Sequence, residues 1–267
     1  MLMAIDIGNT QIAAGLFVED ELVAHWRISS TGKRTEDETW ILLDAICRTH
    51  GYNIVETTGL AISSVVPDMT PTFEKMAQKY LHINPITVRH DLDLGINIRY
   101  ENPASVGADR ICNAIAGYAK FGGPLVVVDF GTATTFDVIS KEGDYLGGII
   151  APGIETSALI LHQRAAKLPR VELSFPERII GFSTETSIQS GLMYGAVEMV
   201  DGLVNRIREE LGSDAVTVAT GGLARVVLNK LRSVRIIEPY LTLEGLRIIY
   251  NRVLSGEKTK QSGWSRT

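Results

Sequence analysis

The sequence is poor in cysteine, long apolar runs and positive charge. Cys47 and Cys112 are its only cysteines among 267 residues, which excludes a disulfide framework and a cysteine-based metal cluster. No run approaches the roughly 18 apolar residues of a membrane-spanning helix, and the N-terminus lacks the basic flank and apolar stretch of a signal peptide. The net charge of -5 argues against nucleic acid as the main partner. A small phosphorylated ligand stays compatible, because an acidic protein can be locally positive. We therefore expect a cytoplasmic protein that binds neither membrane nor nucleic acid.

Familiar signatures of phosphate-binding and hydrolytic enzymes are also missing. The chain contains no Gly-x-x-x-x-Gly-Lys-Ser/Thr loop, no Gly-x-Gly-x-x-Gly turn and no Gly-x-Ser-x-Gly elbow. None of its five histidines has a partner at the spacing of a metal ligand or a proton relay. If the chain handles phosphate, it must use another backbone arrangement.

The composition is that of an ordinary globular protein, with 45% hydrophobic and 21% charged residues. Strand-like and helix-like segments alternate, which indicates an α/β fold. The expected strands are 3–8, 12–18, 21–28, 60–66, 86–88, 125–130, 134–139, 145–150 and 216–219. One helix is expected from a Thr35–Glu38 capping box to His50, and another begins at a Thr70 cap followed by Pro71. Three further helices are expected to end near Gly122, Leu161 and Leu211, and two more run over 223–231 and 243–254.

Two stretches share one pattern. Asp129-Phe130-Gly131-Thr132 ends an apolar run, and Asp6-Ile7-Gly8-Asn9-Thr10 does the same about half the chain earlier. Glycine lets backbone N–H groups approach a polyanion, and an aspartate beside phosphate requires a cation between them. A single stretch of this kind is more typical of a plain tight turn. The pair predicts two similar halves that face one ligand, with Asp129 as a cation holder.

The position of the repeat predicts two halves, 1–120 and 121–255, with a boundary near the Gly122-Gly123-Pro124 break and a disordered tail at 256–267. Gly221-Gly222 ends a third strand, where bare backbone could lie against a base or ribose. A strand-to-helix turn that needs positive φ is the alternative.

Asp109 is a further acid of interest, because it lies near a helix start between small residues and follows an irregular loop. Such a carboxylate could accept the proton of a substrate hydroxyl, and Arg110 could bind a substrate carboxylate. The alternative is an aspartate that complements the helix dipole, with Arg110 in a surface salt bridge.

Six motifs in this order resemble the type III pantothenate kinases of bacteria, and the resemblance covers residues 1 to about 254. The motifs are Asp6-Ile7-Gly8-Asn9-Thr10, Ile62-Ser63-Ser64-Val65-Val66-Pro67, Asn102-Pro103 with Gly107-Ala108-Asp109-Arg110, Asp129-Phe130-Gly131-Thr132-Ala133, Gly147-Gly148-Ile149-Ile150-Ala151-Pro152-Gly153 and Thr220-Gly221-Gly222.

This resemblance implies an α/β fold of two duplicated ribonuclease-H-like (actin-like ATPase) domains, with the active site in the cleft between them. The implied fold is that of the acetate and sugar kinase/Hsp70/actin superfamily. The implied activity is ATP-dependent phosphorylation of pantothenate to 4'-phosphopantothenate, the first step of coenzyme A synthesis. The implied enzyme is a homodimer that uses Mg²⁺ and a monovalent cation, K⁺ or NH₄⁺.

On the matching positions, the resemblance makes Asp109 the base for the pantothenate hydroxyl. Asp129 would hold the monovalent cation, and Asp6 would lie near magnesium through the phosphates. The residues implied to contact ATP are Asp6, Ile7, Gly8, Asn9, Thr10, Gln11, Ile12, Ala13, Thr132, Gly221 and Gly222. Those implied to contact pantothenate are Tyr100, Gly107, Ala108, Asp109, Arg110 and Thr184, the last from its own or a neighbouring subunit.

Two other functions are compatible with such a scaffold: a phosphohydrolase of the same fold and a non-enzymatic nucleotide-binding regulator. The intact acids Asp6, Asp109 and Asp129 speak against the regulator, since binding alone needs no base. The helix over 186–211 carries an apolar stripe that either forms a dimer contact or faces its own sheet; its members are Leu192, Ala196, Met199 and Leu203.

Overall fold

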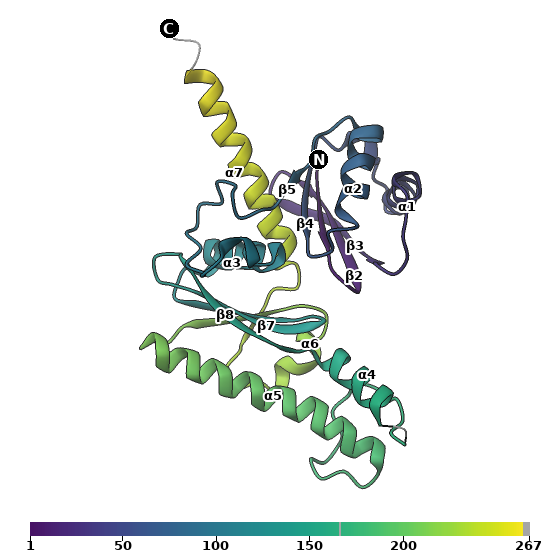
Figure 1. Cartoon of the computed structure of the whole chain (residues 1–267), viewed down its shortest axis with the longest axis vertical. Coiled ribbons are helices and arrows are strands. Elements are labelled where there is room, and N and C mark those ends of the chain that lie inside the picture. Colours follow the sequence, from purple (N-terminus) through teal and green to yellow (C-terminus); the bar gives the residue numbers. More distant parts are fainter. Residues whose placement is uncertain (166, 264–267) are drawn as a thin grey trace. The chain divides into compact units, whose positions relative to one another are not determined.

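A computed structural model describes residues 1–165 and 167–263 of the chain, and Figure 1 shows its elements. The chain divides into two compact units, each built on one five-stranded sheet. Unit 1 comprises residues 1–116 together with the chain from Leu241 onward, and unit 2 comprises Gly117–Tyr240. Among the described helices, none combines the length and apolar character of a bilayer-spanning segment.

The sheet of unit 1 has the strand order β3-β2-β1-β4-β5. An antiparallel meander supplies three strands, and β4 and β5 then add in parallel to β1. Its strands are β1 (Leu2–Ile7), β2 (Gln11–Val18), β3 (Glu21–Ser29), β4 (Gly59–Ser64) and β5 (Ile86–Thr87). Its helices are α1 (Glu36–Thr49), α2 (Thr70–Met76), most of α3 (Ala108–Phe121) and α7 (Leu241–Gly263).

The two faces of this sheet carry different helices. Ile5, Ile7 and Ile12 form a buried core with Leu43 of α1 and Phe73 of α2. The C-terminal helix α7 contacts β1, β2 and β4, and Figure 1 shows it on the side away from α1 and α2. The alternation of side chains along β1 therefore directs its isoleucines to one helix layer and Asp6 toward the other face.

Unit 2 repeats this topology with the strand order β10-β9-β6-β7-β8. Its strands are β6 (Leu125–Phe130), β7 (Ala133–Ile139), β8 (Tyr145–Pro152), β9 (Val216–Thr220) and β10 (Ile236–Ile237). Its helices are α4 (Ile154–Arg164), α5 (Thr184–Leu211) and the short α6 (Ala224–Val227). Again an antiparallel meander is followed by two parallel strands. This correspondence confirms the prediction of two duplicated α/β halves.

The stripe on α5 faces the core of its own unit. Ala196 is buried among the strands of the second sheet, and Leu192, Met199 and Leu203 pack against the same cluster. Figure 1 shows α5 lying along β7 and β8. The structure thus favours the core alternative for this stripe over the dimer contact.

Some local expectations differ from the structure. The predicted Thr70 cap is wrong: α2 begins at Thr70 without a side-chain cap, because the Thr70 hydroxyl donates to Ser64 Oγ at 2.8 Å instead. The helix expected over 223–231 is divided into α6 and a 3₁₀ turn at Leu228–Lys230, and β10 was not predicted.

The bounds of the two units differ from those of the predicted halves. The units divide at 116/117, and α7 clusters with unit 1 because its buried residues Leu243, Leu246 and Ile249 pack toward that sheet. Helix α7 continues to Gly263, through most of the segment predicted to be a disordered tail. The end of that predicted tail, 264–267, lies outside the described residues.

Candidate active site

The turn between β1 and β2 is tight and open to solvent. Gly8 donates its N–H to the Gln11 carbonyl oxygen at 3.0 Å, and a Cβ on Gly8 would lie 2.9 Å from that oxygen. Asn9, Thr10 and Gln11 are exposed, whereas Ile12 is fully buried. Glycine therefore permits the sharp reversal, and a ligand can reach the turn. Phosphate binding by this turn stays a prediction.

Asp6 lies one residue before the end of β1, on the sheet face opposite the isoleucine core. The register pairs it with Ala13 on β2 and with Ser63 on β4, and paired residues share a face. The carboxylate is half-buried, while Ile5 and Ile7 on either side are fully buried in the core. The strand thus fixes an acid beside the exposed Gly8 turn.

Asp109 lies in the first turn of α3, where the helix dipole favours a carboxylate. Its Oδ1 accepts a hydrogen bond from the Arg110 N–H at 2.8 Å, and a Cβ on Gly107 would overlap the same oxygen. Burial raises the pKa of the Asp109 carboxyl above its ordinary value, although the Arg110 N–H and guanidinium oppose the rise. A raised pKa strengthens a carboxylate as a proton acceptor.

The other predicted pantothenate contacts of unit 1 flank this acid. Arg110 is only 7% exposed, which excludes the surface salt bridge considered from the sequence. Ala108 is buried, and Gly107 packs near Val65 on the segment after β4. Tyr100 lies in the loop before the 3₁₀ turn at Pro103–Ser105 and is exposed. Their contact with a substrate stays a prediction.

Cys112 connects the two acids of unit 1, a role that the sequence analysis missed. Burial raises the pKa of its thiol well above the ordinary value, and the nearby charges of Asp6 and Asp109 raise it further. Cys112 is fully buried, and both carboxylates act on its thiol through their charge. The available signal was the spacing: Cys112 follows Asp109 by three residues, which places both on one helix face. The structure thereby brings Asp6 and Asp109 into one neighbourhood.

In unit 2, Asp129 occupies the same place in β6 that Asp6 occupies in β1. Its cross-strand partners are Thr135 on β7 and Thr220 on β9, so two threonines share its face. Gly221 has φ +92°, and a Cβ there would lie 2.6 Å from Phe130 N and would overlap Asp129 Oδ1. The predicted positive-φ turn is confirmed, and its function is to let backbone cross directly over the carboxylate. Gly222 continues this turn toward α6, and its contact with a nucleoside stays a prediction.

The turn after β6 is held by the start of α4. Gly131 donates its N–H to Ala133 O at 3.1 Å. The Thr132 carbonyl oxygen accepts from Gly153 N at 3.2 Å and from Thr156 Oγ1 at 2.6 Å. A Cβ on Gly153 would lie 2.8 Å from the Thr132 carbonyl carbon, so only glycine fits. Gly153 ends one of the six motifs, but nothing in the sequence pattern indicated a role for it.

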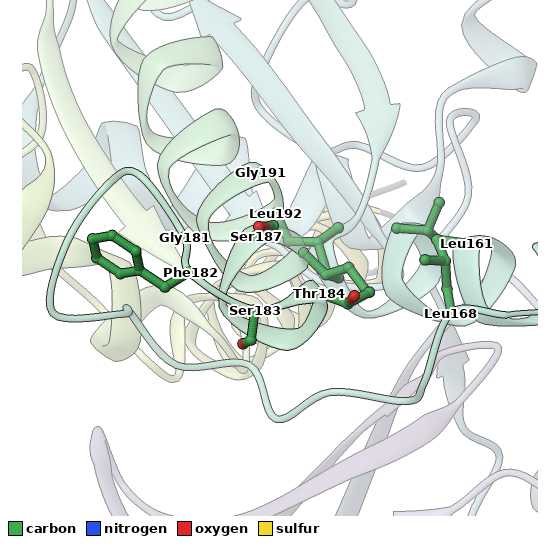
Figure 2. A pocket seen from close by; sticks show the side chains of 10 residues that line it. Leu161, Leu168, Gly181, Phe182, Ser183, Thr184, Ser187, Gly191 and Leu192 are labelled. Atoms are coloured by element: carbon green, nitrogen blue, oxygen red, sulfur yellow. The ribbon is translucent and has the colours of Figure 1, made fainter.

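Thr184 lies apart from these acids in the chain, at the first residue of α5. It lines a cavity of about 730 Å³ whose walls come from α4, the segment before α5, and α5 itself (Figure 2). The other lining residues are largely apolar, with two serine hydroxyls: Leu161, Leu168, Gly181, Phe182, Ser183, Ser187, Ile188, Gly191 and Leu192. The cavity has the character of a site for a ligand or a protein segment that is mostly apolar.

The donor set around each acid can be compared with the expected cations. Within the described residues, no group of three or more His, Cys, Asp or Glu side chains is placed to hold a metal ion. Asp129 with the hydroxyls of Thr135 and Thr220 presents oxygen donors of the kind that hard cations prefer. Asp6 supplies one carboxylate, which suits a Mg²⁺ ion that takes its other ligands from phosphate and water. The residues at Asp129 therefore fit a monovalent cation, and Asp6 fits Mg²⁺.

Comparison with known proteins adds independent information. A family model described as "Type III pantothenate kinase" matches residues 2–206. A protein of that name from Thermomicrobium roseum is 49% identical over 95% of this chain and 98% of its own. Another from Moorella thermoacetica is 47% identical over 94% of this chain and 99% of its own. Among solved structures, the ROK hexokinase of Thermus thermophilus has a TM-score of 0.53 at 13% identity, covering 95% of this chain and 99% of its own, which supports the fold.

Proposed function

The chain belongs to the type III pantothenate kinase family, and we propose how its residues carry out the reaction of that family. The family assigns it ATP-dependent phosphorylation of pantothenate in coenzyme A biosynthesis. The single observation that supports our assignment of roles is that the charges of Asp6 and Asp109 both act on the buried Cys112 thiol. Asp6 lies one residue before the end of its strand, beside an open turn, and Asp109 has a raised pKa.

Asp109 is the general base in this proposal. The hydroxyl oxygen of pantothenate attacks the γ-phosphorus of ATP, the bond to the β-phosphate oxygen breaks, and ADP leaves. The hydroxyl proton passes to an oxygen of Asp109, which Gly107 and the Arg110 N–H hold in place. General bases contribute about 10²–10⁴-fold to such reactions. Arg110 supplies the cation for the pantothenate carboxylate.

The two glycine turns hold the triphosphate. Residues from Asp6 to Ala13 form one phosphate-binding turn, and Gly131 with Thr132 forms the second. Gly221 and Gly222 present bare backbone to the nucleoside. Mg²⁺ at Asp6 would neutralise charge on the phosphates, and K⁺ or NH₄⁺ at Asp129 would add a second positive centre.

Replacement of the base tests this assignment. Asp109→Asn keeps the shape and the half-buried position but cannot accept the proton, so we expect kcat to fall by about 10²–10⁴-fold. Binding of an ATP analogue, measured by calorimetry, should stay within about threefold of the unmodified protein. Asp91→Asn is the control, because Asp91 is exposed and pairs with the exposed Arg89. Near-normal turnover by purified Asp109→Asn would refute the base assignment.

Exchange of the monovalent cation tests Asp129. We expect ADP release with pantothenate to rise with KCl or NH₄Cl at constant ionic strength and not with NaCl alone. Asp129→Asn should lose that response, because it removes the charged donor between Thr135 and Thr220. Equal rates in sodium and potassium would refute the role. Phosphate release without pantothenate would indicate a phosphohydrolase instead.

A homodimer is also part of the proposal. The surface around the 730 Å³ cavity exposes large apolar side chains, among them Ile180 at 75% and Phe182 at 79%. Exposed apolar patches of this kind mark interaction surfaces. A second copy on this surface would cover the patch and bring a partner to Thr184, which lines the cavity. Sedimentation of the protein and of Phe182→Ser tests this. We expect a dimer that weakens in the variant, and a monomeric parent protein would contradict it.

We further propose a cytoplasmic location, as expected for an enzyme of coenzyme A synthesis.

A further inference from the structure

Helix α7 meets the helix that carries Asp109 at one point of backbone contact. A Cβ on Gly245 would lie 2.6 Å and 2.7 Å from C and Cα of Cys112, and it would overlap the carbonyl oxygen of Cys112 as well. All three atoms belong to the backbone of α3, so no side-chain rotation can relieve the overlap. Any side chain at position 245 must therefore move α3 or α7.

A polar link follows one residue later along α3. The Thr242 hydroxyl donates to Asn113 Oδ1 at 2.8 Å, and Asn113 is fully buried. Two successive residues of α3 are thus held by the first turns of α7. Both lie within one turn or so after Asp109, because a helix rises only about 1.5 Å per residue. A displacement of α3 at Cys112 and Asn113 would therefore move the Asp109 carboxylate by a similar amount.

Helix α7 is itself fixed by the sheet that carries Asp6. It contacts β1, β2 and β4, and Leu246 and Ile249 are fully buried. Further along, the Tyr250 ring occupies the space beside Gly59 at the start of β4. The sheet holds α7, and α7 holds α3. The distance between the two site acids consequently depends on the α7–α3 contact.

We propose that Gly245 is a positioning residue for Asp109: its missing side chain sets how closely α3 approaches the sheet, and so where the base stands relative to Asp6. This inference rests on the proposed role of Asp109 as the base. Helix α7, which is far from Asp109 in the sequence, would thus affect the rate of the reaction.

Gly245→Ala tests the proposal against a matched control in the same helix. Gly256→Ala adds the same methyl group where nothing lies within 4 Å, so its kinetics should equal those of the parent protein. For Gly245→Ala we expect kcat to fall by about 10–100-fold, since misplacement of a reacting group by about 1 Å can cost that much. KM for ATP should stay within about twofold, because the phosphate turns do not move.

The experiment separates this proposal from the proposed function. If Gly245 acts through the base, Gly245→Ala should cause no further loss in an Asp109→Asn background, as coupled residues are non-additive. High turnover of Asp109→Asn alone would overturn the base, whatever Gly245→Ala does. Gly245→Ala that melts earlier yet keeps parental kcat while folded would overturn the positioning role.

A second variant covers the case in which Gly245→Ala does not fold. Thr242→Val removes the hydroxyl link to Asn113 with little change in shape. We expect a several-fold loss of kcat with KM for ATP unchanged, and a circular dichroism spectrum like that of the parent. Parental kcat in Thr242→Val would then overturn the proposal.

Discussion

Gly107→Ala should separate catalysis from stability more cleanly than other substitutions in this protein. The added Cβ would overlap Asp109 Oδ1, and its next neighbours are Asp109 Cγ and Val65 Cγ1, both at 3.6 Å. The clash therefore falls on one carboxylate oxygen and leaves the backbone almost untouched. The simplest relief is a rotation of the Asp109 side chain.

The magnitude follows from what that rotation breaks. The Asp109 Oδ1 acceptor would move away from the Arg110 N–H, now at 2.8 Å. A hydrogen bond to a charged group contributes about 1.5–3 kcal/mol, and a half-buried carboxylate recovers part of this from water, so we expect roughly 1–2 kcal/mol of destabilisation. Turnover should fall further, by about 10²-fold, because the displaced oxygen no longer meets the substrate hydroxyl.

A coupled ADP-release assay with pantothenate and ATP in potassium buffer measures the loss of kcat, and urea denaturation measures stability. Gly202→Ala is the control: it lies on α5 with nothing within 4 Å of its Cβ, so it should be neutral or slightly stabilising. A Gly107→Ala protein with kcat within twofold of the parent, but a raised KM for pantothenate, would refute the argument. Gly107 would then line the substrate and not position the base.

Other expectations concern titration and stability. Because burial raises the pKa of Asp109, kcat should fall as pH drops through a value above the usual 4 or so for aspartate, and that limb should vanish in Asp109→Asn. Burial opposes the ionisation of Asp201, but hydrogen bonds from Ser233 and the Arg232 N–H outweigh it and lower its pKa. Asp201→Asn should therefore cost roughly 2–3 kcal/mol in urea denaturation. This contribution is present above about pH 4 and is lost as pH falls through the lower native pKa; an unchanged acid midpoint in the variant would contradict it. Burial raises the pKa of Cys47 to about 11 and that of Cys112 well above its usual value, so a thiol reagent should react with neither before urea is added.

Most strands and helices could be predicted because their signals are local. The capping box at Thr35 and Glu38 forms as expected, and the apolar run 125–130 is β6 itself. The Asp-x-Gly repeat predicted the duplication because each copy lies at the same place in an equivalent strand. Periodicity and turn residues carry this information within a few positions of the chain.

Tertiary partners could not be predicted in the same way. The Thr70 cap was wrong because Ser64, six residues earlier, offers its hydroxyl as an acceptor. The roles of Gly153 and Gly245 depend on backbone from distant segments, and a lone glycine in a helix or at its start carries no sign of what it touches. The unit to which α7 belongs was missed for the same reason, since its apolar face fits either sheet equally well by pattern alone.

The two cation roles that we propose for Asp6 and Asp129 differ in the oxygen donors around each acid. Asp6 and Asp129 are each the fifth residue of a six-residue strand, two positions before a glycine turn. Asp6 has Ala13 on one side and Ser63 on the other, whereas the partners of Asp129 are both threonines. A cation at Asp129 could take several oxygens from the protein, which suits a weakly hydrated monovalent ion. One at Asp6 must take most of its ligands from phosphate and water, as Mg²⁺ does in nucleotide sites. The difference in oxygen donors lies on the β2/β7 side, where Thr135 supplies a hydroxyl that Ala13 lacks, and the division of the two proposed roles rests on it.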